Sequence, residues 1–187
     1  MKHKVKLGAS FDVNSIFNSP VLGAVRTKNF WLAQVFRKGV LIDEWPWLNL
    51  VTTVGLNHLL DVTIGAASQN ASWYIGLIEG AAVTPSLAAG DTLSSHAGWT
   101  ENTNYTGNRK TWTKNAAASG GSITNSNAPA EFTIGAGGAT IEGAFLCSAS
   151  SGTSGVLYAA GTFTEKVLVQ NDILKITGTF TTADDGV

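Results

Sequence analysis

Residues 66–134 decide the fold, and they read AASQNASWYIGLIEGAAVTPSLAAGDTLSSHAGWTENTNYTGNRKTWTKNAAASGGSITNSNAPAEFTI. Small residues make up most of this stretch, and large aromatic residues stand among them at intervals. Leu, Glu, Lys and Arg, which favour helices, are scarce. Short apolar runs between clusters of Gly, Asn, Ser and Pro are typical of strands joined by turns. The stretch therefore predicts a β-sheet protein with little helix.

The same pattern continues to the C-terminus. Residues 73–78, WYIGLI, form an apolar run that predicts a central strand buried on both faces. We expect further strands at residues 110–113, 122–125, 131–134, 140–147, 156–163, 166–169 and 173–180. Strands spaced by roughly ten residues predict an antiparallel β-sandwich, jelly-roll-like in its connections.

On the N-terminal side, residues 29–48 predict a hairpin with its turn at Arg37, Lys38 and Gly39, and Pro46 predicts an edge strand. Residues 49–64 predict the one helix, capped by Asn49 or Thr52 and ended by Gly65. Its apolar residues recur mostly at spacings of three and four and indicate a single apolar face. They are Val54, Leu56, Leu59, Leu60 and Ile64.

Residues 1–28 lack a core-forming pattern and are assigned to an N-terminal arm, with the sandwich domain spanning residues 29–187. Two interpretations stay open: a frayed terminus, or an arm that packs on a neighbouring subunit. The second rests on five apolar side chains that are costly to leave in water. These predicted partner-contact residues are Phe11, Ile16, Phe17, Val21 and Leu22. The basic start MKHKVK is followed by no apolar run, so we expect no secretion signal.

Composition excludes several classes of function. The chain has 187 residues, of which 44% are hydrophobic and 13% charged, and its formal net charge is −1. A charge this small argues against binding nucleic acid, and no apolar run is long enough to span a membrane. Cys147 is the single cysteine, so no disulfide forms within the chain.

Groups that do chemistry are sparse. Asp91, Ser94, Ser95 and His96 lie within six residues, whereas a working triad is assembled from separate elements. Paired carboxylates for glycoside cleavage are conceivable. The candidates are Glu79, Asp91, Glu101, Glu131 and Glu142. Nothing matches a zinc site, and the glycines at 135–138 lie between strands, which predicts a turn rather than a phosphate-binding loop. We predict no catalytic, metal-binding or cofactor-binding residues and no cofactor.

The order of motifs from about residue 40 to 180 resembles a family of small virion proteins of tailed bacteriophages. The matching positions are Asn49-Leu50-Val51-Thr52, Gly55-Leu56-Asn57, Gly76, Leu77, Asp91, Thr92, His96, Gly98, Trp99, Glu101, Tyr105, Arg109, Gly143, Ala144, Phe145, Leu146, Gly155, Leu157, Tyr158, Asp172 and Leu174. The resemblance implies a structural virion protein, assembled in the bacterial host cytoplasm and placed on the head or at the tail. Residues 1–28 lie outside it.

The leading hypothesis is a capsid decoration (cement) protein that binds the major capsid protein as a homodimer or homotrimer. The alternative is a tail-associated or receptor-binding module that grips host glycans by stacking tryptophans on sugar rings. Candidates for stacking are Trp31, Trp45, Trp47, Trp99 and Trp112. We further expect one structural cluster to order the long loop near residues 79–98, with Arg109 joining a carboxylate to it. Its members are Asp91, His96, Trp99, Glu101, Tyr105 and Arg109.

Overall fold

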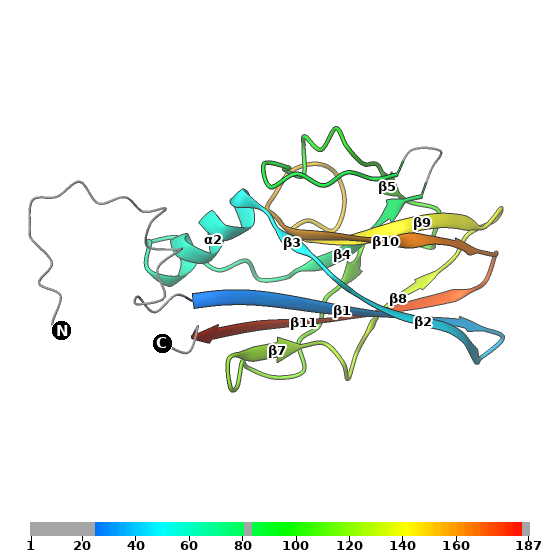
Figure 1. The fold of residues 1–187 in the computed structure, drawn as a ribbon, viewed down its shortest axis with the longest axis horizontal. Helices are drawn as coiled ribbons and strands as arrows, with labels where there is room; N and C mark the ends of the chain where they lie inside the picture. Colours follow the sequence, from blue (N-terminus) through cyan, green and yellow to red (C-terminus); the bar gives the residue numbers. More distant parts are fainter. Residues whose placement is uncertain (1–24, 81–83, 185–187) are drawn as a thin grey trace, which may run out of the picture.

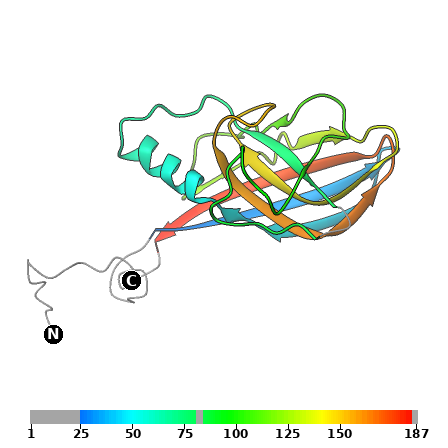
Figure 2. The same ribbon diagram turned by 90° about the horizontal axis from the view of Figure 1, so that it is seen from above.

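The computed structural model describes residues 25–80 and 84–184, which form two antiparallel sheets packed face to face with one helix at one end (Figures 1 and 2). This architecture confirms the predicted antiparallel β-sandwich. The predicted arm residues Phe11, Ile16, Phe17, Val21 and Leu22 lie outside the described residues.

The first sheet has five strands in the order β2-β1-β11-β7, with β8 also paired to β11. They are β1 (Val25–Arg37), β2 (Val40–Leu48), β7 (Ser122–Thr124), β8 (Ala130–Thr133) and β11 (Ile173–Asp184). The second sheet has six strands in the order β3-β10-β9-β4-β5, with β6 paired to β4. They are β3 (Leu50–Val51), β4 (Tyr74–Glu79), β5 (Glu101–Asn102), β6 (Lys110–Thr111), β9 (Ala139–Cys147) and β10 (Leu157–Leu168).

Local sequence signals account for much of this layout. Lys38 and Gly39 turn the β1–β2 hairpin with φ angles of 51° and 79°, and Pro46 lies in β2, an edge strand. Asn171 turns β10 into β11 with a φ of 68°. Bidentate hydrogen bonds of 2.8 Å from Arg37 to Asp172 tie these two turns together.

Three of the differences from the predicted boundaries affect the layout most. β1 begins at Val25, so the last four residues assigned to the arm belong to the sheet. The two strands expected at 156–163 and 166–169 form the single strand β10, whose register against β9 shifts between Thr162 and Lys166. A bulge absorbs the irregularity without ending the strand.

The third difference lies where the chain crosses between the sheets. After β2 the chain passes through Asn49 and pairs as β3 with β10 before the helix α2 (Thr53–Thr63) begins. Of the two predicted caps, Thr52 is the one used: its hydroxyl oxygen accepts a hydrogen bond of 3.0 Å from the Gly55 amide. The expected helix start at residue 49 is therefore wrong by four residues, because residues 50 and 51 pair with β10.

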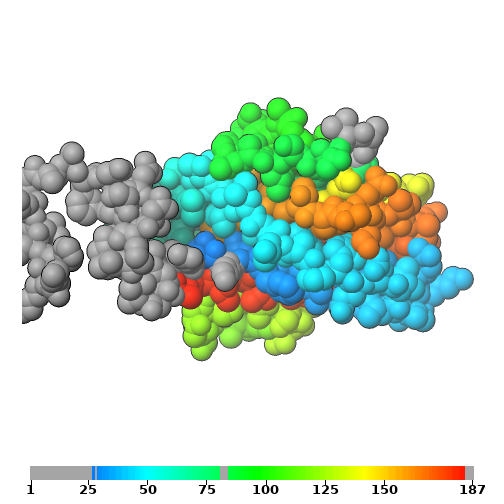
Figure 3. All heavy atoms as spheres, viewed as in Figure 1, coloured from blue at the N-terminus to red at the C-terminus, as the bar shows by residue number. Residues whose placement is uncertain are grey.

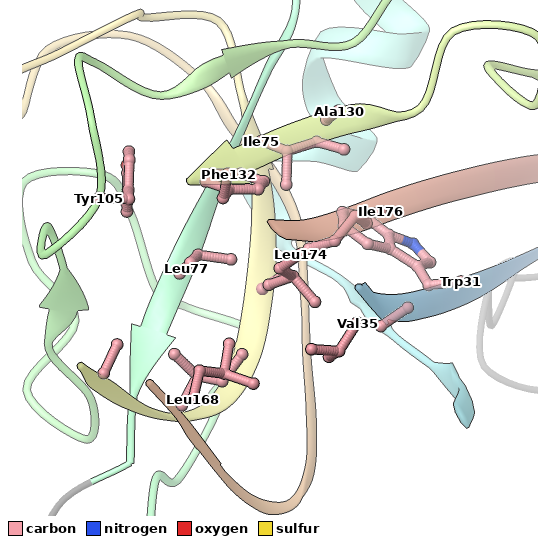
Figure 4. Close-up of a cluster of buried hydrophobic side chains, with 14 of the residues drawn as sticks. Trp31, Val35, Ile75, Leu77, Tyr105, Ala130, Phe132, Leu168, Leu174 and Ile176 are labelled. Atoms are coloured by element: carbon pink, nitrogen blue, oxygen red, sulfur yellow. The ribbon is translucent and has the colours of Figure 1, made fainter. Parts of the chain in front are cut away.

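The main core fills the space between the two sheets with aliphatic and aromatic side chains, ten of which are labelled in Figure 4. A row of rings follows the sandwich, with centroids 4.9–6.1 Å apart between successive members. In order they are Trp45, Phe163, Trp47, Trp31 and Phe180. Gly161 makes room for this row, because a Cβ there would meet the Trp47 ring at 2.8 Å.

A second cluster, which we call the roof cluster, lies between the outer face of the second sheet and the loop of residues 84–99. It comprises Ile78, Leu93, Trp99, Phe145, Cys147, Leu157 and Ala160. The covering loop crosses above the sheet in Figure 1 and is joined to the helix by a hydrogen bond of 2.8 Å from the Thr53 amide to the Ala89 carbonyl. The long loop is therefore packed against the sheet, as we expect for a loop of this length in a folded domain.

Gly55 sets how closely α2 packs on the sandwich, and Gly55→Ala tests this. A Cβ at residue 55 would lie 2.2 Å from the Tyr158 carbonyl oxygen, so the helix must move away from β10. We expect a loss of roughly 1–3 kcal/mol of stability, although alanine has the higher helix propensity. Thermal unfolding measures the change.

Gly90→Ala is the matched control, because a Cβ at residue 90 would meet no atom within 4 Å. Its melting temperature should stay close to that of the wild type. A Gly55→Ala protein as stable as the Gly90→Ala protein would show that the helix does not depend on this close approach.

Candidate functional site

The predicted loop cluster separates into three parts, of which the first holds the covering loop. Trp99 donates an indole hydrogen bond of 2.9 Å to Asp91 Oδ2, which also accepts one of 3.0 Å from the Ala88 amide. The His96 ring stacks on Trp99 with centroids 3.8 Å apart, and its Nδ1 lies 3.0 Å from the Trp99 carbonyl oxygen. These contacts close the loop upon itself above the roof cluster.

The second part is a buried ion pair. Arg109 Nε and Nη2 donate to the two carboxylate oxygens of Glu101 at 2.8 and 2.7 Å. The same guanidinium donates to the carbonyl oxygens of Ala149 and Gly152 at 3.1 and 2.8 Å. One side chain thus joins β5 to the loop that connects β9 and β10.

Phe145 links these two parts from beneath. Its ring lies 5.1 Å from the Trp99 ring and 5.1 Å from the Arg109 guanidinium carbon. His96, Trp99, Phe145 and Arg109 therefore form one continuous series of contacts, in which the His96 and Trp99 rings are stacked and the Trp99 and Phe145 rings are tilted by 44°. The sequence motifs contained Phe145, but nothing in its spacing indicated that it would lie between the ring and the charge.

Tyr105 does not join this series of contacts. It packs edge-on against Phe132 with centroids 4.9 Å apart and belongs to the main core between the sheets. Burial, followed by the nearby charge of Glu101, raises the pKa of the Tyr105 hydroxyl well above its usual value. The contacts that order the long loop therefore come from Asp91, His96 and Trp99, and Tyr105 takes no part in them.

The acidic groups of this cluster serve as hydrogen-bond acceptors within it. Asp91 and Glu101 already accept the hydrogen bonds of the cluster, and burial raises the pKa of the Cys147 thiol, so the reactive thiolate is disfavoured. Both carboxylates stabilise neighbouring loops in this geometry.

Of the other candidate carboxylates, Glu79 lines a cavity of about 370 Å³ together with Glu101, and Glu131 lies elsewhere. Glu79 accepts a hydrogen bond from Asn102, and Glu131 pairs with Lys175 at 2.6 Å. Glu142 Oε2 is buried and has no hydrogen-bond partner within residues 25–80 and 84–184. No group of three or more His, Cys, Asp or Glu within those residues could hold a metal ion.

The tryptophans proposed to stack on sugars are mostly internal. Trp31, Trp45, Trp47 and Trp99 are 0–9% exposed. Trp112 is half-buried, and so is Trp73, which the list of candidates omitted. Four of the five candidates thus belong to the cores, where no ligand can stack on them.

Most of the large exposed hydrophobic side chains come from one stretch of the chain, and we call this set the apolar flank. Of the eleven large hydrophobic side chains exposed in the described parts of the chain, eight lie between residues 40 and 64. They are Val40, Leu41, Ile42, Leu48, Leu50, Leu56, Leu60 and Ile64. Figure 3 shows this segment, in light blue and cyan, extending along the visible face from the hairpin tip to α2.

Part of the flank is the apolar face predicted for the helix. Leu56, Leu60 and Ile64 fall on one face of the helix, as the spacing indicates, but they are 44%, 56% and 83% exposed. The helix instead meets β10 through Gly55, the buried residue of α2. The spacing of apolar residues predicted correctly that they share one face of the helix. It did not indicate which face of the helix packs on the sandwich, and this is set by the close approach at Gly55.

No helix among the described residues is long and apolar enough to cross a membrane. Neither a scan against protein-family models nor a search of curated proteins gives a match to the chain.

Arg109→Ala tests the structural role of the ion pair. The change leaves the Glu101 carboxylate without its partner and the Gly152 carbonyl oxygen without its side-chain donor, so we expect a loss of about 3 kcal/mol. For a domain of this size the melting temperature should fall by about 6–12 °C. Limited proteolysis should also cut the loop between β9 and β10 faster than in the wild type.

Lys110→Ala serves as the control, because Lys110 follows Arg109 in sequence and its Nζ donates at the surface to the Thr106 carbonyl. It should shift stability by no more than about 0.5 kcal/mol. Equal melting temperatures for the two variants would contradict the assigned role of Arg109.

Proposed function

We propose that this chain is a structural virion protein of a tailed bacteriophage, and that it decorates the head by binding the major capsid protein. Two observations support the proposal. The first is the order of motifs from about residue 40 to 180. The second is the exposed apolar flank on the surface of the sandwich. The protein is placed on the virion after assembly in the host cytoplasm, without a cofactor and without an enzymatic step.

The apolar flank carries the proposal. Apolar patches of this kind on a soluble protein mark surfaces that bind another protein. Leu56, Leu60 and Ile64 share one side of α2 at intervals of four residues, which suits docking of the helix side into an apolar groove. The occupant that we propose for this surface is the shell formed by the major capsid protein.

The outer face of the first sheet is less suited to such a contact. Lys175 pairs with Glu131 across it, and Gln34 donates to Glu44 on the neighbouring strands. Polar cross-strand pairs of this kind are typical of a solvated sheet face. The flank reaches this face at Leu48, which pairs with the 47% exposed Phe30. We therefore place the shell against α2 and the adjoining part of the flank, and leave the polar pairs of Lys175 and Gln34 in water.

Self-association follows from the geometry of a shell. A capsid presents the same surface around its two-fold and three-fold axes, so subunits bound there meet in symmetric sets. We propose a dimer or a trimer. A tail-associated module that recognises host glycans is the second candidate, and the burial of Trp31, Trp45, Trp47 and Trp99 weakens the form of it that relies on those rings.

A double variant of the flank tests the proposal. Leu56→Ser with Leu60→Ser removes two half-exposed apolar side chains without disturbing the core. If both side chains are buried against the shell, the affinity for undecorated capsids should fall about 30-fold, corresponding to about 2 kcal/mol. Co-sedimentation of the purified protein with capsids measures the affinity.

Val167→Ser with Val169→Ser is the matched control. These valines are 68% and 47% exposed, comparable to the two leucines, but they lie beyond the flank at the end of β10. The control should bind capsids like the wild type. An unchanged affinity for the flank variant, or an equal loss for both variants, would argue against docking through α2.

A further inference from the structure

An aromatic pocket of about 530 Å³ opens at the end of the sandwich where α2 lies. Its lining comes from α2, from the residues just before β4 and around β6, and from single residues of β7, β9, β10 and β11. The volume lies within the range of pockets that hold small ligands. The flank and the pocket use different residues of α2: Leu56 and Leu60 belong to the flank, and His58 and Leu59 to the pocket.

Four aromatic side chains form the walls. Trp73 contacts Tyr158 and Trp112 contacts Phe180, in each case edge to face with centroids 5.5 Å apart. All four rings are only half-buried, so part of each is available to a ligand. Phe180 is also the last member of the ring row that fills the core, so the pocket lies where that row reaches solvent.

Polar groups stand beside these rings. Asn70 Nδ2 lies 3.0 Å from Nε2 of His58, and this contact holds both side chains in the lining. The hydroxyl of Tyr158 and the ammonium of Lys114 have no hydrogen-bond or ion-pair partner within the described chain. No Asp or Glu is among the residues of the lining.

These features select the chemistry of a ligand. A purely apolar ligand would leave the Tyr158 hydroxyl without a partner, which is costly once water is displaced. A cationic ligand would find no carboxylate in the lining. A sugar ring satisfies both requirements, because its C–H faces pack on aromatic rings and its hydroxyls bond to polar side chains.

We infer that this pocket binds a saccharide, stacked on Trp112 and Trp73 and bonded to Asn70 and Tyr158. Lys114 is the only lysine or arginine in the lining, so an acidic sugar binds more tightly than a neutral one. The inference does not depend on docking to a shell: it concerns different residues and holds for a protein of the head or of the tail.

Indole N–H resonances in ¹H–¹⁵N NMR spectra test the inference in the intact chain, using trigalacturonate as the acidic probe and tri-N-acetylchitotriose as the neutral probe. The six tryptophans give separate reporters. The indole signals of Trp73 and Trp112 should shift on titration, with Kd below about 10 mM for the acidic probe. The signals of Trp31, Trp45, Trp47 and Trp99 should stay in place.

Two variants sharpen the test. Trp112→Leu keeps an apolar side chain but removes the stacking ring, so the shift at Trp73 should be lost while the Trp31 signal reports an intact core. Lys114→Met should remove the preference for the acidic probe and leave neutral-probe binding unchanged. An acidic preference that survives this change would overturn the assigned role of Lys114.

Three outcomes of these titrations would overturn the inference. The inference is overturned if neither probe shifts Trp73 or Trp112, or if shifts appear only at the buried tryptophans. It is also overturned if a peptide of residues 5–22 shifts the two pocket indoles and neither saccharide does, since the pocket is then a site for the chain's own N-terminal segment. Capsid co-sedimentation is unaffected by any of these outcomes, so failure here and failure of the proposed decoration role are distinguishable.

Discussion

The packing of aromatic rings between the two sheets is the interaction on which the rest of the structure depends. Trp47 lies between Phe163 and Trp31, at centroid distances of 4.9 and 5.6 Å, and Gly161 leaves the space that this ring needs. The indole N–H groups of Trp31, Trp45 and Trp47 have no hydrogen-bond partner among the described residues, a cost that close ring packing must offset. The main core is therefore stabilised by close packing and by the burial of apolar surface. The ion pairs lie outside it.

The positions of the aromatic pocket and the apolar flank depend on what covers each side of this core. At one end the ring row reaches solvent and forms the aromatic pocket beneath α2. On the outer face of the second sheet, Trp99 and Arg109 hold the loop of residues 84–99 and the β9–β10 loop in place, and the first of these loops covers the roof cluster. The helix approaches the sandwich through Gly55, which turns Leu56 and Leu60 outward into the flank. A protein with few titrating groups thus presents shape and apolar area to its partners.

The sequence predicted features that depend on neighbouring residues, such as turns and helix caps. It did not predict features that depend on how the elements pack against one another. The turn at Lys38 and Gly39 and the cap at Thr52 were foreseen because backbone conformation and short-range hydrogen bonds leave clear signals. The outward direction of Ile64 was not foreseen, since periodicity defines a stripe without saying what it faces. The pairing of Arg109 with a carboxylate was foreseen, but not that the carboxylate is that of Glu101. The placement of Tyr105 in the main core depends on which sheet face its loop follows, which the sequence does not indicate.

The copy number of this protein in purified virions tests the central claim, a role as a decoration protein of the head, most directly. Quantitative mass spectrometry against labelled peptides of this chain and of the major capsid protein gives the ratio of the two. A decoration protein should be present at a fixed ratio to the capsid protein, matching one symmetric set of sites on the shell, and should remain with tailless heads. A few copies per particle, recovered with isolated tails, would contradict the account and favour a tail-associated module.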